Sequence, residues 1–328
     1  MNQMTPRRPP AISLPALLAH ADWGSDPRKR QVAVARLVDG TDGTGSGYRV
    51  ESLAAAPAGP PVSGDLFDDL AVACEGGKAV VGFDFPIGLP RAYAATVTVT
   101  SFPEFLDGIG SPPWQEVEQV AEKPSEISLY RPFYPNRPGG TRRWHLEHAL
   151  GLSASELRRR CDGSDAETPF WTLGGKQAGK ASLHGWRLLR EARARGLAIA
   201  LWPFDGTLAA LLGSAAQFVV AETYPREFYR YIGAPPRGRW SKRRRDDRLL
   251  SVPSLLSWAD SLGVSWEAAI RRRVVAGLSD GPTGEDEFDA VVGVLGVISV
   301  VTGEIPAGPP PDDNAVFATE GWILGRAG

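Results

Sequence analysis

Cysteine and histidine are scarce in this chain of 328 residues, which contains two cysteines and four histidines. Cys74 and Cys161 lie far apart, and neither has a histidine pair at zinc-finger spacing beside it. The sequence therefore excludes a four-ligand zinc site of the zinc-finger kind and a disulfide scaffold. Cys74 falls on the apolar face of a predicted helix, so we expect its side chain in the core, where free cysteines are usually found.

Long hydrophobic runs are also missing. No uninterrupted apolar stretch approaches the ~18–20 residues that a helix needs to cross a bilayer. The first residues are polar and rich in proline, and they lack the apolar stretch and the small-residue cleavage site of a signal peptide. We therefore expect no membrane partner and a cytoplasmic location, with residues 1–14 forming a disordered or loosely attached tail.

Basic residues are unevenly distributed, although the net charge is only −2. A chain with that charge does not attract nucleic acid as a whole. The segment RGRWSKRRRDDR (237–248), however, contains seven Arg or Lys residues against two Asp. Such a run is a solvated helix face in one interpretation. In the other it contacts phosphate, with Lys242 and Arg243 binding the substrate.

The first part of the chain predicts three antiparallel strands, a helix and a buried strand. In order, these elements are the strands Leu17–Trp23, Gln31–Val38 and Gly47–Leu53, the helix Asp65–Cys74 and the strand Ala79–Phe83. A turn rich in Gly and Asp joins the second and third strands, which is typical of a hairpin. The run AVVGF is continuously apolar and contains β-branched residues, as expected of a parallel strand buried on both faces.

Residues 91–180 are rich in Pro, Gly and aromatic residues and have few periodic segments, which favours a large insertion or lid after the fourth strand. The rest predicts a basic helix Ser182–Arg195, strands Leu197–Trp202 and Gln217–Ala221, helices around 225–232, 245–261 and 265–277, an apolar helix Glu285–Val301 and a short closing strand Glu320–Leu324. This order predicts a single α/β domain over residues 15–328, with a mixed sheet covered by helices.

Carboxylates stand where apolar elements end. Asp22, Asp84 and Glu222 follow predicted strands, Asp289 lies in the first turn of the predicted apolar helix, and Asp286 lies one turn earlier on the same face. Carboxylates in such surroundings are usually paired or bound to a cation. Two of them ~4 Å apart repel by about 4 kcal/mol at an effective dielectric near 20, and divalent cations would offset that repulsion.

An all-oxygen ligand set favours Mg²⁺ or Mn²⁺. Any one of these acids could instead form a turn, cap a helix or interact with the helix dipole. The prediction of a metal site therefore depends on the whole set and on the order of the elements that carry it.

Four segments carry a resemblance to a known family: VVGFDFPIGLP (80–90), AETYPREFY (221–229), DEFDAVVGVLG (286–296) and EGWILG (320–325). They resemble the signature blocks of a domain-of-unknown-function family (number four-two-nine), whose members are described as predicted nucleases of RNase H-like fold. The resemblance covers most of the chain and weakens between residues 91 and 170. The spacing of Asp286 and Asp289 also resembles the last helix of Holliday-junction resolvases.

The resemblance implies a metal site formed by Asp22, Asp84, Glu222 and Asp289, with Asp286 as an accessory residue. The expected reaction is two-metal hydrolysis of a phosphodiester in a nucleic acid or a nucleotide-like ester, with Asp22 bridging two Mg²⁺ or Mn²⁺ ions. Asp84 and Glu222 would bind on one side and Asp289 on the other. Two alternatives stay open: a domain that binds a small phosphorylated ligand or phosphorylates it with ATP, and a catalytically inactive scaffold for a protein partner.

The segment GGKQAGKA (174–181) is close to a phosphate-binding loop, but Ala181 stands where the metal-binding hydroxyl should be. A Gly-rich turn that contacts phosphate without ATP chemistry and a plain connecting loop are both open. Within the resemblance, Lys176, Gln177 and Lys180 are expected substrate contacts.

The predicted insertion also carries His145 and His148, for which we expect a surface or lid role. Its aromatic residues either stack on unpaired bases or form a small core of their own.

Overall fold

The computed structural model describes residues 14–24, 26–39, 46–56, 65–135, 143–163, 166–173, 177–233, 240–309 and 314–328. Of the predicted tail, residues 1–14, only residue 14 is among the described residues. Lys176 lies outside them.

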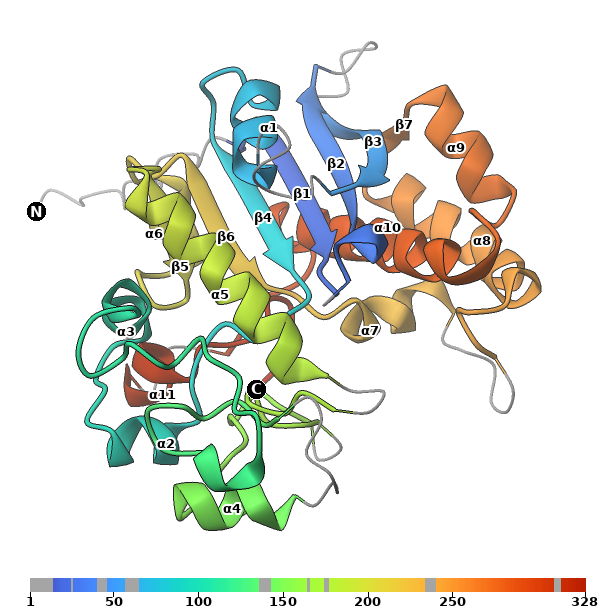
Figure 1. The fold of residues 1–328 in the computed structure, drawn as a ribbon. Helices are drawn as coiled ribbons and strands as arrows, with labels where there is room; N and C mark the ends of the chain where they lie inside the picture. Colours follow the sequence, from blue (N-terminus) through green and yellow to red (C-terminus); the bar gives the residue numbers. More distant parts are fainter. Residues whose placement is uncertain are drawn as a thin grey trace, which may run out of the picture.

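A seven-stranded sheet forms the centre of the molecule, with the strand order β5-β6-β4-β1-β2-β3-β7 (Figure 1). The strands are β1 (Leu17–Asp22), β2 (Gln31–Val38), β3 (Gly47–Ala55), β4 (Ala79–Phe83), β5 (Ile199–Trp202), β6 (Phe218–Glu222) and β7 (Ser265–Trp266). β2 pairs antiparallel with β1 and β3, whereas β1, β4, β6 and β5 run parallel. The predicted mixed α/β sheet is therefore confirmed, and the carboxyl ends of β1, β4 and β6 meet at one edge.

Helices cover both faces of the sheet (Figure 1). The longer ones are α1 (Leu66–Ala73), α5 (Ala178–Ala194), α8 (Arg245–Ser261), α9 (Ala268–Val275) and α10 (Gly281–Val301), and the short ones are α2 (Arg91–Thr96), α3 (Phe102–Gly108), α4 (Trp144–Leu150), α6 (Leu208–Leu212), α7 (Pro225–Phe228) and α11 (Asn314–Thr319). One core lies between the sheet and α1 and α5, and a second lies between the sheet and α8, α9 and α10. Among the described residues, no helix is both long and apolar enough to span a membrane.

Helix α10 lies very close to the sheet because a glycine faces β1. A Cβ atom at Gly293 would lie 2.2 Å from Cγ of His20, a fully buried side chain on β1. Since side chains alternate along a strand, Asp22 points to the same face as His20. The close approach therefore brings the acid-bearing end of α10 to the carboxyl end of β1.

Helix α1 begins where its sequence provides a capping box. The Asp65 carboxylate accepts hydrogen bonds from the backbone N–H groups of Phe67 (2.9 Å) and Asp68 (3.1 Å), and the Asp68 carboxylate accepts one from the N–H of Asp65 (3.1 Å). The helix ends at Cys74, whose side chain is buried, as predicted.

Residues 91–135 and 143–173 form short helices and irregular segments that share the core of α5. The rings of Phe102, Phe105 and Phe133 lie 5.5, 5.9 and 5.8 Å from Trp186 of α5. Most aromatic side chains of this segment are buried, and Trp144 is a solvent-exposed exception at 54%. These rings therefore anchor the segment to the rest of the molecule and do not form a separate small core.

The expected histidine pair of this segment is divided between two environments. His148 is exposed on α4, in agreement with a surface position. His145 is half-buried, with Nδ1 lying 3.0 Å from the hydroxyl of Tyr134.

The prediction of a helix from residue 265 was wrong. Ser265 and Trp266 form β7, which pairs parallel with β3, and α9 starts only at Ala268. The Glu267 carboxylate accepts hydrogen bonds from the N–H groups of Ala269 (2.6 Å) and Ile270 (3.1 Å), so it caps the helix and fixes its start.

The closing strand Glu320–Leu324 was also predicted wrongly. The structure has a single bridge there, between Ile323 and Glu222. Gly321 and Gly325 adopt φ values of +70° and +82°, which interrupt an extended conformation on both sides of the bridge.

Candidate functional site

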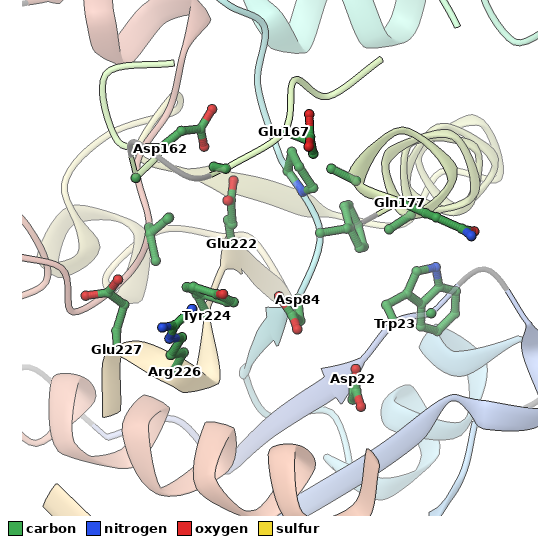
Figure 2. Close-up of a pocket in the computed structure, with 18 of the residues that line it drawn as sticks. Asp22, Trp23, Asp84, Asp162, Glu167, Gln177, Glu222, Tyr224, Arg226 and Glu227 are labelled. Carbon is green, nitrogen blue, oxygen red and sulfur yellow. The ribbon is translucent and has the colours of Figure 1, made fainter. Parts of the chain in front are cut away.

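Five acidic side chains gather at the edge where β1, β4 and β6 end. Asp22, Asp84, Glu222 and Asp286 line a cavity of about 840 Å³, and Figure 2 shows the first three of them. Asp289 is only 3% exposed and lies close enough to Asp22 and Asp84 to raise the pKa of both. The prediction that Asp289 lies in the first turn of its helix was wrong: α10 begins at Gly281, so Asp289 lies about two turns into it. The structure thus brings the predicted acids to one place from four separate elements.

Burial and mutual repulsion oppose the ionisation of these acids. Burial, followed by repulsion from Asp289 and Asp84, raises the pKa of Asp22 well above its usual value. The same two causes, burial and then Asp289, raise the pKa of Asp84 to about 7, and burial raises that of Asp286 to about 6. Burial also raises the pKa of Asp289, although Lys242 opposes the shift. Such a cluster attracts positive charge.

Both oxygens of Asp289 have partners. The hydroxyl of Tyr229 donates to Oδ1, and the ammonium of Lys242 donates to Oδ2. Lys242 Nζ also lies 3.3 Å from Oε1 of Glu285. A substrate contact by Lys242, as predicted, requires this ion pair to open.

Glu222 belongs to a second, separate ion pair. Arg159 donates from Nη1 to Oε2 (2.5 Å) and from Nη2 to Oε1 (2.7 Å), and the N–H of Ile87 donates to Oε2 (2.7 Å). Arg159 Nη2 also donates to Oδ1 of Asp162 (2.8 Å). Burial raises the pKa of Glu222 although Arg159 counteracts it. Coordination of a metal by Glu222 would therefore need Arg159 to move.

The fit of a metal ion to this site can be judged from the donors. Within the described residues, no group of three or more His, Cys, Asp or Glu side chains is arranged to hold an ion. The ion pairs of Asp289 and Glu222 engage oxygens that a metal would need. The donor chemistry nevertheless fits: the cluster is all oxygen, and Oδ2 of Asp286 is buried without a hydrogen-bond partner. Asp22, Asp84, Asp286 and Asp289 are the residues that would hold a divalent cation.

Side chains of both charges complete the wall of the cavity. Lys29, Arg226 and Arg326 contribute positive charge, and Gln177, one of the predicted substrate contacts, is part of the lining. Arg326 lies 3.3 Å from Glu227, and the acidic members outside the cluster are Asp26, Asp162, Glu167 and Glu227. Figure 2 shows Gln177 on one side of the acids, with Arg226 and the half-exposed Tyr224 on the other.

The other predicted substrate contacts lie elsewhere. Lys180 lies in the first turn of α5 and is not among the described lining residues. Arg243 is 78% exposed and pairs with Glu285 at 3.2 Å. Residues 166–173 form no strand before α5, so the strand–loop–helix arrangement of an ATP-binding phosphate loop is not found in the described part of this segment.

Arg159 and Tyr229 were not predicted. Arg159 comes from the aperiodic segment, which offers no signal for a partner of Glu222 63 residues away. Tyr229 lies at the end of the block AETYPREFY, seven residues after Glu222, and its place in that block is the signal that could have identified it.

Comparisons of this chain with protein-family models, with curated proteins and with solved structures found no match. The resemblance to the predicted RNase H-like nucleases therefore stays a prediction. The roles proposed below depend on the geometry of the site.

Proposed function

We propose that this protein is a metal-dependent hydrolase of phosphodiesters, with Asp22, Asp84 and Asp289 as ligands of a divalent cation and Asp286 as an accessory ligand. One observation carries the proposal: mutually repelling carboxylates form the floor of a cavity whose wall also presents the cations Lys29, Arg226 and Arg326. A phosphate ester would be attracted by these cations and repelled by the carboxylates of the floor. A cation between substrate and floor removes that conflict.

Asp22 has the central position in the proposed site. Its carboxylate is repelled by those of Asp84, Asp286 and Asp289, which supports the prediction that it is shared between two ions. Bound Mg²⁺ or Mn²⁺ would supply activation of a water for attack on phosphorus and neutralisation of the charge that develops on the phosphate oxygens. An RNase H-like fold is part of this proposal, and the antiparallel-then-parallel sheet order supports it.

The side chains of the wall would bind and orient the substrate. Lys29, Arg226 and Arg326 offer positive charge to phosphate oxygens, and Gln177 offers an amide to a sugar or a base. Tyr224, which is 37% exposed at the end of β6, presents a ring on which a base can stack. The cavity volume of about 840 Å³ is within the range of sites that enclose a small organic ligand.

Cleavage assays test the proposal directly. Single- and double-stranded DNA and RNA, and the small diester bis(p-nitrophenyl) phosphate, are incubated with Mg²⁺, Mn²⁺ or EDTA. We expect cleavage only with metal, and a loss of at least about 100-fold in Asp22→Asn and Asp84→Asn, corresponding to ~2.7 kcal/mol of transition-state stabilisation. Asp69→Asn, which changes an exposed acid on α1, is the control. Full activity of Asp22→Asn, or equal cleavage in EDTA, would contradict the proposal.

Binding of a phosphorylated ligand without cleavage is the second candidate. The ion pairs Lys242–Asp289 and Arg159–Glu222 favour it, because they engage two of the five acids without a metal. Binding of inorganic phosphate or a nucleotide in EDTA, together with the absence of cleavage in metal, would support this candidate.

A further inference from the structure

Lys242 occupies the place where the acid cluster needs positive charge. Its ammonium contacts Oδ2 of Asp289, lies 3.3 Å from Glu285 and is attracted electrostatically by Asp22. The side chain is 31% exposed, so solvent reaches the ion pair. Lys242 is thus a monovalent cation bound at the edge of a site with divalent-cation chemistry.

The backbone that presents Lys242 is held firmly. Arg248, which is fully buried, donates from Nη1 to the carbonyl of Lys242 (2.6 Å) and from its other nitrogens to the carbonyls of Gly277 (2.9 Å) and Ser279 (2.6 Å). The N–H of Ser241 donates to Asp247 at 2.7 Å. Residues 240–248 of the basic run are therefore part of the structure that supports the site, and the part of Lys242 that can move is its side chain.

Asp289 is fixed independently of Lys242. Tyr229 donates to its other oxygen, and the ring of Trp240 lies 5.6 Å from Tyr229 and 6.0 Å from Phe288. If the lysine side chain swings away, the Tyr229 contact keeps the carboxylate in place, and Oδ2 becomes available to another cation.

One ammonium does not balance this cluster. Asp22, Asp84, Asp286 and Asp289 carry four formal negative charges when ionised, and Lys242 carries one positive charge. Oδ2 of Asp286 is buried without a hydrogen-bond partner. A divalent cation would compensate more of the charge, and it would compete with the ammonium for Asp289 because two positive charges at contact distance from the same oxygen repel each other.

We propose that Lys242 is the counter-ion of the acid cluster in the metal-free protein, and that a divalent cation binds by displacing its ammonium from Asp289. The inference rests on the proposed metal site and adds how that site is regulated. The ion pair must open before the metal binds, so it lowers the apparent affinity for metal. The released ammonium stays tethered beside the cavity, where it can contact a phosphate.

Metal binding by the full chain tests the exchange, with Mn²⁺ as the probe. Calorimetric titration compares wild type with Lys242→Met and with Arg245→Met, which removes a charge three residues away that pairs with Asp280 and not with the cluster. We expect Lys242→Met to bind Mn²⁺ about tenfold more tightly than wild type. Arg245→Met should stay within about threefold, because it leaves the competitor in place. Equal or weaker binding by Lys242→Met overturns the inference.

Chemical labelling of the wild type keeps the test valid if Lys242→Met fails to fold. An amine-reactive reagent followed by mass spectrometry reports the modification rate of Lys242, with Lys78, which donates to the carbonyls of Leu211 (3.2 Å) and Ser214 (2.9 Å), as the internal reference. We expect Mn²⁺ to increase labelling of Lys242 relative to Lys78. An unchanged ratio while Mn²⁺ is bound overturns the exchange.

The outcomes separate this inference from the proposed function. If neither wild type nor Lys242→Met binds Mn²⁺, the metal site itself fails and the exchange fails with it. If wild type binds and Lys242→Met binds no more tightly, only the exchange fails. Binding by Lys242→Met alone supports both.

Discussion

Two carboxylate–cation pairs lie at the same edge of the sheet and differ in how firmly they are closed. Arg159 and Glu222 form a two-pronged pair, and the arginine side chain is 1% exposed. Lys242 and Asp289 meet through one nitrogen and one oxygen, and the lysine side chain is 31% exposed. The planar guanidinium matches a carboxylate in two places, whereas an ammonium is a point charge on a flexible stem.

The contrast distinguishes a structural pair from an exchangeable one. Arg159 also contacts Asp162 and the carbonyl of Ile87, so it joins the segment before α5 to the ends of β4 and β6. Lys242 has fewer partners and borders acids that are under-compensated. The first pair holds the edge of the cavity together, and the second is the one that a metal would replace in the proposed exchange.

The largest effect on stability is expected for the Arg159–Glu222 pair. Arg159→Leu leaves Glu222 buried without its partner, so the free energy of unfolding should fall by about 3–5 kcal/mol, measured by urea denaturation. Arg159→Lys keeps the charge but loses the second prong, and it should recover part of this loss. If Arg159→Leu lowers the free energy of unfolding by less than Lys242→Met does, the Arg159–Glu222 pair is not the more stabilising of the two.

Stability of the metal-free protein should depend on pH in the direction set by the raised pKa values. Asp84, with a pKa of about 7, and Asp286, with a pKa of about 6, bind protons in the folded state at pH values where the unfolded chain has lost them. Unfolding free energy in EDTA should therefore fall as pH rises from about 4 to about 7, by at most about 1.4 kcal/mol per pH unit for each group.

Asp84→Asn removes one of these groups, so its slope in the same denaturation series should be shallower than that of wild type. A rise in stability over this pH range that Asp84→Asn leaves unaltered would show that folding does not raise the pKa values of these acids.

Loss of the Lys242–Asp289 pair should have a moderate effect on stability. Lys242→Met in EDTA at pH 7 should lower the unfolding free energy by about 1–2 kcal/mol, because solvent screens the pair and the acids can take up a proton in place of the ammonium. Urea denaturation with and without Mn²⁺ measures this loss. The metal should increase the unfolding free energy of Lys242→Met by more than that of wild type. A greater gain in wild type would count against an exchangeable lysine.

The smallest effect is expected for the third cation of this edge. Arg243 pairs with Glu285 but is 78% exposed, so Arg243→Met should change the unfolding free energy by no more than about 0.5 kcal/mol. Together with Arg159 and Lys242 it forms a series in which the effect decreases as exposure increases. A loss above 1 kcal/mol in the same urea experiment would break that series.

Strand periodicity predicted much of this site. β2 and β4 were predicted residue for residue, because Gln31–Val38 alternates and Ala79–Phe83 is continuously apolar. Once β1 and β4 are placed side by side and parallel, Asp22 ends one strand and Asp84 follows the other, so the two acids must lie close together. This part of the site was predictable because local pattern and sheet geometry determine it.

The partners of the acids could not be predicted. Arg159 lies in a segment without periodicity, and Lys242 was recognised as basic but not as the partner of an acid 47 residues further on. A charge run does not specify which carboxylate it meets, because that depends on how α8 and α10 pack. Short elements such as β7, with two residues, also escape a periodicity argument.

The missing side chain at Gly293 has a consequence one turn earlier in its helix. The imidazole of His20 fills the space that a methyl group would need, so a larger residue would force α10 and β1 apart. Asp289 stands one turn along that helix, and Asp22 stands two residues along that strand. The distance between these two carboxylates is therefore set by how closely α10 and β1 pack below the cavity. The same packing would set the size of an ion that they could share.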